Sequence, residues 1–236
     1  MKLRRCVVAL ALAALASTAA QAEDMWEGEA SLTGSRTTGN TDTVDIGAAL
    51  KLKNTEGLWR HKFRLSGDYG EAKGLTNKER FNVSYRLDRT VSDRLFVFGE
   101  ANGFYDTFGP FREGHFFGSG LGYAVLENEP TTWDVTAGLG YRDQEASDGD
   151  TQEKVALRFA SDFDWILNDN VSLYNDSEAY IAASDEYLWN EVGLTSTLMG
   201  NLAARASFRV DYHSEVPLGR VNTDTITRFG LVYTIP

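Results

Sequence analysis

Apolar and polar side chains alternate along most of this chain. In the segment VDIGAALKLK, residues 44–53, every second residue is apolar, while Asp45, Lys51 and Lys53 lie on the opposite face. A period of two residues is typical of β-strands whose two faces meet different surroundings, and it disagrees with an amphipathic helix. The same alternation predicts twelve strands, over residues 26–36, 43–53, 58–70, 79–89, 94–105, 115–126, 132–142, 153–165, 171–182, 187–198, 202–213 and 223–235.

The segments between the predicted strands alternate between short and long. NTEG, TVSD, ENEPT, ILNDN and MGN are short, whereas EAKGLTNK, DTFGPFREG, RDQEASDGDTQ and SEVPLGRVN are long. Short turns at one end and longer loops at the other are the pattern of antiparallel outer-membrane barrels. We therefore predict an all-β fold, a closed antiparallel up-and-down transmembrane β-barrel of about twelve strands.

Aromatic residues near the strand ends favour this barrel over a soluble β-sandwich, which the alternation alone would also allow. They lie on the apolar faces of their strands and are predicted to form two girdles. From Trp59 to Tyr69 the strand is about 33 Å long, which covers roughly 25 Å of membrane at a tilt of about 40°. The predicted girdle residues are Trp26, Trp59, Tyr69, Tyr85, Tyr105, Tyr123, Trp133, Tyr141, Trp165, Tyr212 and Tyr233.

Residues 1–22 have the features of a secretory signal peptide. MKLRRC carries positive charges, VVALALAALASTAA is apolar, and Ala20-Gln21-Ala22 is a cleavage site of the A-x-A type. A single-pass anchor is the alternative, but the apolar stretch falls short of the roughly 20 residues that span a bilayer. We expect residues 1–22 to be removed and residues 23–236 to form one barrel, exported to the outer membrane of a Gram-negative cell.

The composition restricts partners and chemistry. With 34 acidic and 23 basic residues the net charge is −11, so nucleic acid, which requires a basic face, is not an expected partner. The single cysteine, Cys6, lies in the predicted signal peptide, which excludes disulfides and thiolate metal sites from the remaining chain. We find no catalytic, nucleotide-binding or metal-binding motif, and we predict a non-enzymatic protein without a cofactor. A hydrolase, with His213 as its base, is the enzymatic alternative.

In a barrel the polar faces of the strands line the lumen, and the charges there are unevenly distributed. A predicted basic wall on the second to fourth strands carries Lys51, Lys53, Arg60, Lys62, Arg64, Arg80 and Arg86. A predicted acidic wall on the eighth to tenth strands carries Asp162, Asp164, Asp176, Glu178 and Glu191. The two walls either produce a transverse field in a narrow water-filled pore, or they pair and plug the interior.

Aromatic residues also lie on the predicted inward face. We expect them to fill space rather than to stack on a sugar or a base; they are Phe96, Phe98, Phe104, Phe116, Tyr174, Tyr180, Tyr187 and Trp189. On the opposite face Asn175, Ser177 and Asn190 interrupt a row that should contact lipid, where polar side chains are costly. This marks either a protein contact or a strand register that is shifted by one residue, and we favour the shifted register.

The predicted loops are acidic, as in ASDGDTQE with Asp148 and Asp150. Carboxylates are the ligands that calcium prefers, but the spacing of an EF-hand loop is absent. We expect solvated loop charges, and divalent cation binding stays open.

Several segments resemble the salt-induced outer-membrane proteins, a Gram-negative family of unknown function. They are WEGEASLTGSRTTGNTDTVDIGAALKLK, WRHKFRLSGDYGEAKG, DRLFVFGEANGFYD, GLGYAVL and DTITRFGLVY, and they extend over essentially the whole chain after residue 22. The most specific pattern is W-x-G-x-x-S-L-x-x-S-x-x-T-G-N-T-D-T, which begins at Trp26. The resemblance implies an outer-membrane barrel with a link to salt or envelope stress, and it implies no reaction.

The end of the chain departs from the usual last strand of outer-membrane barrels, which closes on an aromatic residue. Here Tyr233 is followed by Ile235 and Pro236, so the signal for the barrel-assembly machinery is weakened. That machinery, outer-membrane lipid and lipopolysaccharide are the expected partners.

The expected function is that of a non-enzymatic outer-membrane barrel with a narrow pore for small charged or zwitterionic solutes. The alternative is a structural or partner-docking envelope barrel whose interior is plugged by side chains. The sequence defines neither the solute nor the oligomeric state.

Overall fold

The computed structural model describes residues 26–38, 43–72, 75–183, 186–216 and 219–236, and nearly all of them lie in β-strands. The strands are β1 (Glu27–Thr38), β2 (Thr43–Glu56), β3 (Trp59–Ala72), β4 (Leu75–Thr90), β5 (Leu95–Asp106), β6 (Phe111–Asn128), β7 (Thr131–Ala146), β8 (Thr151–Asn168), β9 (Val171–Ile181), β10 (Glu186–Met199), β11 (Leu202–His213) and β12 (Thr223–Ile235). The described residues include no helix with the length and hydropathy of a membrane span. The predicted signal peptide lies outside the described residues.

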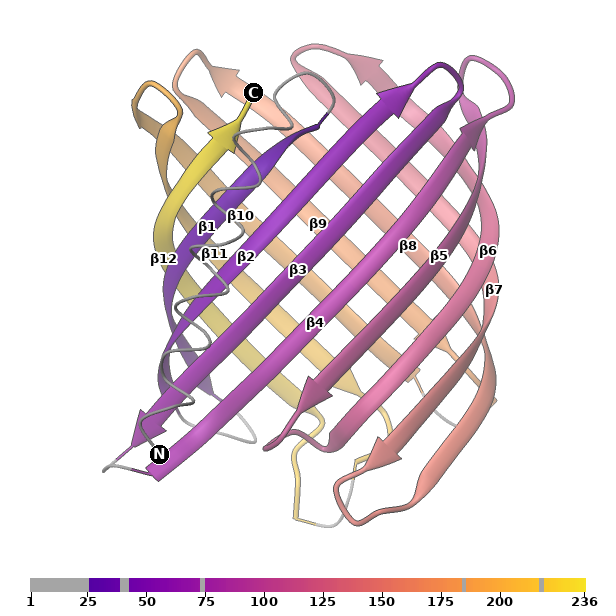
Figure 1. The fold of residues 1–236 in the computed structure, drawn as a ribbon, viewed down its shortest axis with the longest axis vertical. Helices are drawn as coiled ribbons and strands as arrows, with labels where there is room; N and C mark the ends of the chain where they lie inside the picture. The colour runs from indigo at the N-terminus through magenta and orange to yellow at the C-terminus, as the bar shows by residue number, and fades with distance from the viewer. Residues whose placement is uncertain (1–25, 39–42, 73–74, 184–185, 217–218) are drawn as a thin grey trace.

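The strands form one closed sheet (Figure 1). Each strand pairs antiparallel with its neighbours in sequence, and β1 pairs with β12 from Gly28–Ile235 to Thr38–Thr225 without a register shift. Closure pairs both edges of every described strand, as a sheet in contact with lipid requires. The predicted closed up-and-down barrel is therefore confirmed.

The two ends of the barrel differ in their connections. At the end where the chain finishes, shown at the top of Figure 1, two residues separate β2 from β3 and two separate β10 from β11. Gly57 and Gly200 in these turns have φ of 58° and 52°, a left-handed conformation that tight hairpin turns need and glycine adopts readily. We call this end the short-turn end, and the opposite one the long-loop end.

Three of the predicted long loops are wrong in extent. β3 continues to Ala72 and β4 begins at Leu75; likewise, β6 begins at Phe111 and β7 continues to Ala146. Glycine, asparagine and threonine in these segments predict loops, but ladder pairing with a neighbouring strand overrides such local preferences. The hairpins at the long-loop end therefore extend as paired strands.

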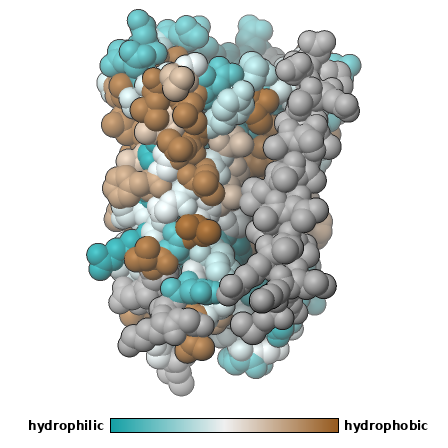
Figure 2. All heavy atoms as spheres, turned by 60° about the vertical axis from the view of Figure 1, so that its left-hand side comes forward, coloured by the Kyte–Doolittle hydropathy of each residue, from teal (hydrophilic) through white to brown (hydrophobic). Residues whose placement is uncertain are grey.

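The outward face of the barrel is apolar. Leu32, Ile46 and Phe117 are 62%, 63% and 59% exposed, and other large apolar side chains are exposed on every strand around them. Figure 2 shows one side of the barrel, with hydrophobic residues between hydrophilic ends. An apolar surface of this extent requires lipid rather than water around it.

The aromatic residues predicted for the girdles lie on this outward face. Trp26 and Trp133 are half-buried, and each of the others is at least 37% exposed. Several polar tips find partners: Trp133 Nε1 donates to Ser161 Oγ at 2.9 Å, and the Tyr85 hydroxyl lies 2.8 Å from His61 Nδ1. An apolar ring with a satisfied polar tip suits the boundary between lipid and water.

Candidate functional site

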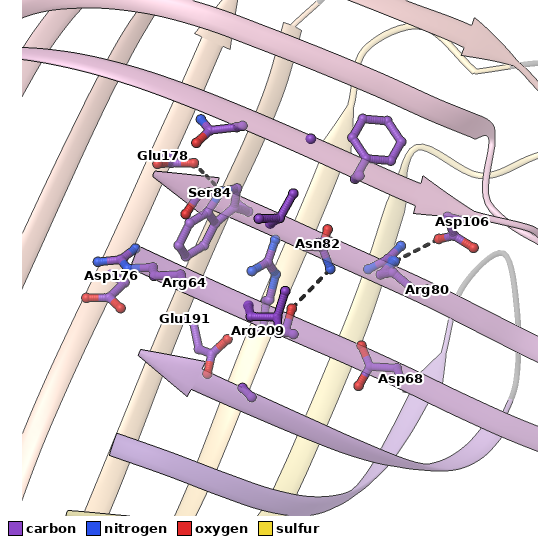
Figure 3. Close-up of a pocket in the computed structure, with 18 of the residues that line it drawn as sticks. Arg64, Asp68, Arg80, Asn82, Ser84, Asp106, Asp176, Glu178, Glu191 and Arg209 are labelled. Atoms are coloured by element: carbon purple, nitrogen blue, oxygen red, sulfur yellow. Dashed lines mark hydrogen bonds and ion pairs between the residues drawn. The ribbon is translucent and has the colours of Figure 1, made fainter. Parts of the chain in front are cut away.

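The barrel encloses a cavity of about 370 Å³ that is lined by residues from most strands (Figure 3). It extends from Glu29 and Lys51 to Pro110 and His213, which lie toward the long-loop end. Both signs of charge line it in nearly equal number. The cations are Lys51, Arg64, Arg80, Arg142, Arg205, Arg209 and Arg228, and the anions are Glu29, Asp68, Asp106, Asp176, Glu178 and Glu191.

Aromatic rings fill the interior beside this cavity. Phe96, Phe98 and Phe116 are at most 5% exposed, and Tyr180 is 7% exposed. A Cβ atom at Gly122 would collide with the Phe96 ring, so inward glycine on β6 leaves the space that the ring occupies. Phe96 and Phe98 fill space as predicted, whereas the other six predicted inward aromatic residues line the cavity; they are Phe104, Phe116, Tyr174, Tyr180, Tyr187 and Trp189.

The register of β9 and β10 is the unshifted one, and the preference for a shifted register is wrong. Tyr174 and Tyr180 are buried on the inward side, opposite in the ladder to Gly193 and Tyr187. The outward polar residues satisfy one another: Asn190 Nδ2 donates to Ser177 Oγ at 2.6 Å, and Asn175 and Asn190 exchange amide hydrogen bonds of 3.2 and 3.3 Å. Mutual hydrogen bonding lowers the cost of polar groups that face lipid.

One class of ion pair in the lumen lies within a strand or between strands that are close together in the sheet. We call these the wall pairs, and their contacts are short and hydrogen-bonded. They are Arg80–Asp106 at 2.7 Å, Arg86–Asp88 at 2.6 Å, Arg205–Glu29 at 2.6 Å and Arg209–Asp211 at 2.7 Å. Arg205 is bidentate to Glu29, the geometry in which arginine and carboxylate attract most strongly.

A second class crosses the lumen, and we call these the cross-lumen pairs. They are Arg60–Asp134 at 3.3 Å, from β3 to β7, Arg64–Asp162 at 3.6 Å, from β3 to β8, and Lys51–Asp176 at 3.8 Å, from β2 to β9. The last two contacts are too long for a direct hydrogen bond. The structure thus brings parts of the predicted basic and acidic walls into loose contact.

The other predicted wall residues are held nearer the sheet. Lys53 lies 2.7 Å from Glu27, and Lys62 lies 3.8 Å from Asp88. Glu178 accepts a hydrogen bond from Trp189 Nε1 at 3.0 Å and pairs with Arg158. Glu191 accepts one from the Tyr174 hydroxyl at 2.7 Å and lies 3.3 Å from Arg228. Asp164 is exposed.

The two predicted walls omit a third group of charges, on β11 and β12. Arg205, Arg209 and Arg228 line the cavity beside the predicted acidic wall. The alternation in ARASFRVD was visible in the sequence and would have placed Arg205 and Arg209 inward. The lumen is therefore not divided into one basic and one acidic half.

Buried charges in the wall of the lumen, away from the cavity, are paired with one another. Lys78 is 7% exposed and pairs with Asp45, and Arg158 lies 2.7 Å from Glu100. Such groups tolerate burial only when they are paired.

The histidines and the carboxylates show no arrangement for hydrolysis or metal binding in the described part of the chain. His213 stacks on Tyr187 with 4.4 Å between ring centroids, and His115 is exposed on the outward face. The described residues contain no serine–histidine hydrogen bond and no group of three or more ligands that could hold a metal ion. Asp148 in the acidic loop accepts from the Asp150 backbone N–H at 3.3 Å.

Two porins and a translocator domain are among the solved structures that are similar to this chain. The NanC porin superposes with a TM-score of 0.60 at 11% identity, covering 86% of this chain and 98% of that one. The KdgM porin has a TM-score of 0.49 at 9% identity, covering 87% and 98%, and the translocator domain of the autotransporter NalP from Neisseria meningitidis has 0.47 at 12%, covering 98% and 96%. At such an identity the NanC match shows the fold alone.

No protein with a curated function matches the sequence. Residues 30–235 match the family that is described as protein of unknown function, DUF481, which is consistent with the resemblance noted from the sequence. Since the match extends over nearly all of the described barrel, the chain belongs to the DUF481 family.

Proposed function

We propose that this chain is an outer-membrane β-barrel that forms a narrow water-filled passage for small charged or zwitterionic solutes. One observation carries the proposal: the closed barrel contains a cavity of about 370 Å³ whose lining carries both signs of charge. If the interior served only to hold the strands apart, apolar side chains would fill it, as they do around Phe96 and Phe98. The NanC match supports a barrel of porin type.

The charge arrangement supports small polar solutes in particular. Cations reach from β2 and β3 toward carboxylates on β7 to β9, which sets a field across the lumen at the cross-lumen pairs. A field of this kind orients a dipolar solute and assists its dehydration. Since cations and anions line the cavity in nearly equal number, we expect weak selectivity between small cations and anions.

The same pairs favour a second candidate, a structural or partner-docking envelope barrel with a plugged interior. In that case the Arg64–Asp162 and Lys51–Asp176 contacts stay closed and block the lumen. Deleting such a barrel would increase osmotic or detergent sensitivity without a defect in solute uptake. The link to salt stress that the resemblance implies is compatible with either candidate function.

Conductance separates the two candidates. The barrel is refolded in detergent, its folded state is checked by heat-modifiable mobility on a gel, and it is inserted into planar bilayers. The pore predicts discrete, uniform conductance steps and a reversal potential near zero in a salt gradient. Folded protein that inserts without any steps would reject the pore and leave the structural barrel.

A further inference from the structure

Two pairs of neighbouring strands place like charges directly opposite each other in the ladder, and the two like-charged pairs face each other across the lumen. On neighbouring strands Lys51 is the direct partner of Arg64, and on the far side Asp162 is the direct partner of Asp176. Each pair joins side chains on the same, inward face of the sheet. We call these four residues the lumen quartet.

Each like-charged pair is unfavourable for the sheet by itself. Like charges at directly opposite positions destabilise a strand pair, whereas opposite charges stabilise it. The row of carboxylates continues on both sides, because Asp134 is the partner of Asp162 and Glu191 the partner of Asp176. A fold optimised for stability alone would alternate the signs along this row.

The two halves of the quartet compensate each other across the lumen, but only loosely. Arg64 lies 3.6 Å from Asp162, and Lys51 lies 3.8 Å from Asp176. Among the described residues, the Arg64 guanidinium and both aspartates make no side-chain hydrogen bond. Lys51, Arg64 and Asp176 line the cavity, and the Asp162 side chain, which is 23% exposed, is in contact with it through Arg64. Figure 3 shows Arg64 and Asp176 close together, on the side of the cavity where Glu178 lies.

The cations of the quartet are also accessible. The side chains of Lys51 and Arg64 are 40% and 39% exposed, more than any other cation of the wall pairs or cross-lumen pairs. Both are long and flexible, so they can withdraw from the aspartates when a solute enters. Lys51 also lies 3.4 Å from Glu29, but that carboxylate is already held by two hydrogen bonds from Arg205.

We propose that the lumen quartet is a binding site for solutes that carry one ammonium and one carboxylate group, the amino acid class of zwitterion. The inference rests on the proposed pore, whose substrate class it narrows. Lys51 and Arg64 hold the carboxylate, and Asp162 and Asp176 hold the ammonium. Each loose contact of 3.6 to 3.8 Å is then replaced by direct, charge-assisted hydrogen bonds to the solute.

Solutes with one charge fit the site less well. A carboxylate alone would separate Lys51 and Arg64 from the aspartates and leave two neighbouring carboxylates without compensation. An ammonium alone would leave the two cations uncompensated in the same way. Because the solute must reach both walls, a larger separation between its charges favours binding.

The test measures block of single-channel current by a matched series of solutes. γ-Aminobutyrate, glycine, butyrate and butylammonium are titrated over the same concentration range, at low ionic strength, on the conducting barrel. We expect γ-aminobutyrate to block at a concentration about tenfold lower than butyrate or butylammonium, and glycine to lie between them.

Single substitutions then identify the site. Arg64→Gln and Asp176→Asn should each raise the blocking concentration of γ-aminobutyrate about tenfold, since each deletes one charged contact. Arg89→Gln and Asp143→Asn are matched controls on the outward face and should leave it unchanged. Heat-modifiable mobility reports folding, and Lys51→Gln replaces Arg64→Gln if the latter does not fold.

The outcomes separate this inference from the proposed function. Conductance steps with equal block by all four solutes would overturn the zwitterion site and leave the pore intact. Preferential block by γ-aminobutyrate that survives Arg64→Gln and Asp176→Asn would overturn the assignment to the quartet. A folded barrel without conductance steps would overturn the proposed function, and the site with it.

Discussion

The wall pairs and the cross-lumen pairs place the same chemical groups in two different surroundings. In the wall pair Arg86–Asp88 the atoms are 2.6 Å apart and the side chains 9% and 2% exposed, whereas in Lys51–Asp176 they are 3.8 Å apart and 40% and 14% exposed. A buried pair must be tight, because an uncompensated charge away from water is costly. A solvent-exposed pair contributes little to stability and is therefore available for another role.

Under the proposed function, the difference assigns stability to the wall pairs and solute passage to the cross-lumen pairs. Wall pairs bind arginine and aspartate side chains against the sheet and define the lumen surface. Cross-lumen pairs join strands that are far apart in the sheet, and Lys51, Arg64 and Asp176 of these pairs line the cavity. Substitutions in the two classes should therefore change different measured quantities.

Removing a wall carboxylate should have the largest effect on stability. Asp88 is 1% exposed and accepts hydrogen bonds from Arg60 at 3.0 Å and from Arg86 at 2.6 Å. Asp88→Ala leaves these cations without their partner, and we expect a loss of about 3–5 kcal/mol in the free energy of unfolding. Urea titration of the refolded barrel measures it, with Asp176→Ala as the matched cross-lumen control at about 1 kcal/mol or less. Equal losses would remove the distinction between the classes.

A wall arginine should have an intermediate effect. Arg209 is bidentate to Asp211, donates to the Tyr187 hydroxyl at 3.0 Å and stacks 4.1 Å from the Trp189 ring. Arg209→Gln keeps part of this packing, and we expect a loss of about 2 kcal/mol. The same urea titration checks it, and a loss below that of Arg89→Gln on the outward face would contradict the prediction.

The fold could be predicted from the sequence because the alternation records which side chains face lipid. The alternation predicts the twelve strands, the outward positions of the aromatic residues and the inward positions of Lys51 and Asp176. The ladder register was not visible, since it depends on the turns and on where the hairpins end. Hence neither the Asp162–Asp176 pair nor the contact of Arg64 with Asp162 could be derived. The sequence pattern favours a shifted register because it does not reveal the hydrogen bonds between Asn175 and Asn190.

A cross-lumen cation should change ion selectivity with little effect on stability. Arg64→Gln deletes one positive charge that faces the cavity, so the channel should become more cation-selective, by on the order of twofold in permeability ratio. Reversal potentials in a salt gradient measure this ratio, with Arg89→Gln as the control. A shift toward anions, or no shift, would mean that Arg64 does not face the conducting path.

Raising the salt concentration should have the smallest effect on conductance, and it should act through the cross-lumen pairs. Screening lengths fall from about 10 Å at 0.1 M to about 3 Å at 1 M, so exposed pairs weaken while buried ones persist. We expect conductance to rise more steeply with salt in the wild type than in the Lys51→Gln–Arg64→Gln double variant. Parallel curves would show that the cross-lumen pairs do not narrow the passage.

The most direct test of a passage narrowed by the cross-lumen pairs is the single-channel conductance of the wild type and of the Lys51→Gln–Arg64→Gln double variant. Both are refolded, checked for heat-modifiable mobility and recorded at the same low salt concentration. We predict discrete steps in both proteins and larger steps in the double variant, in which both loose contacts to Asp162 and Asp176 are absent. Folded wild type and variant that both insert without steps, or steps of equal size in the two, would contradict it.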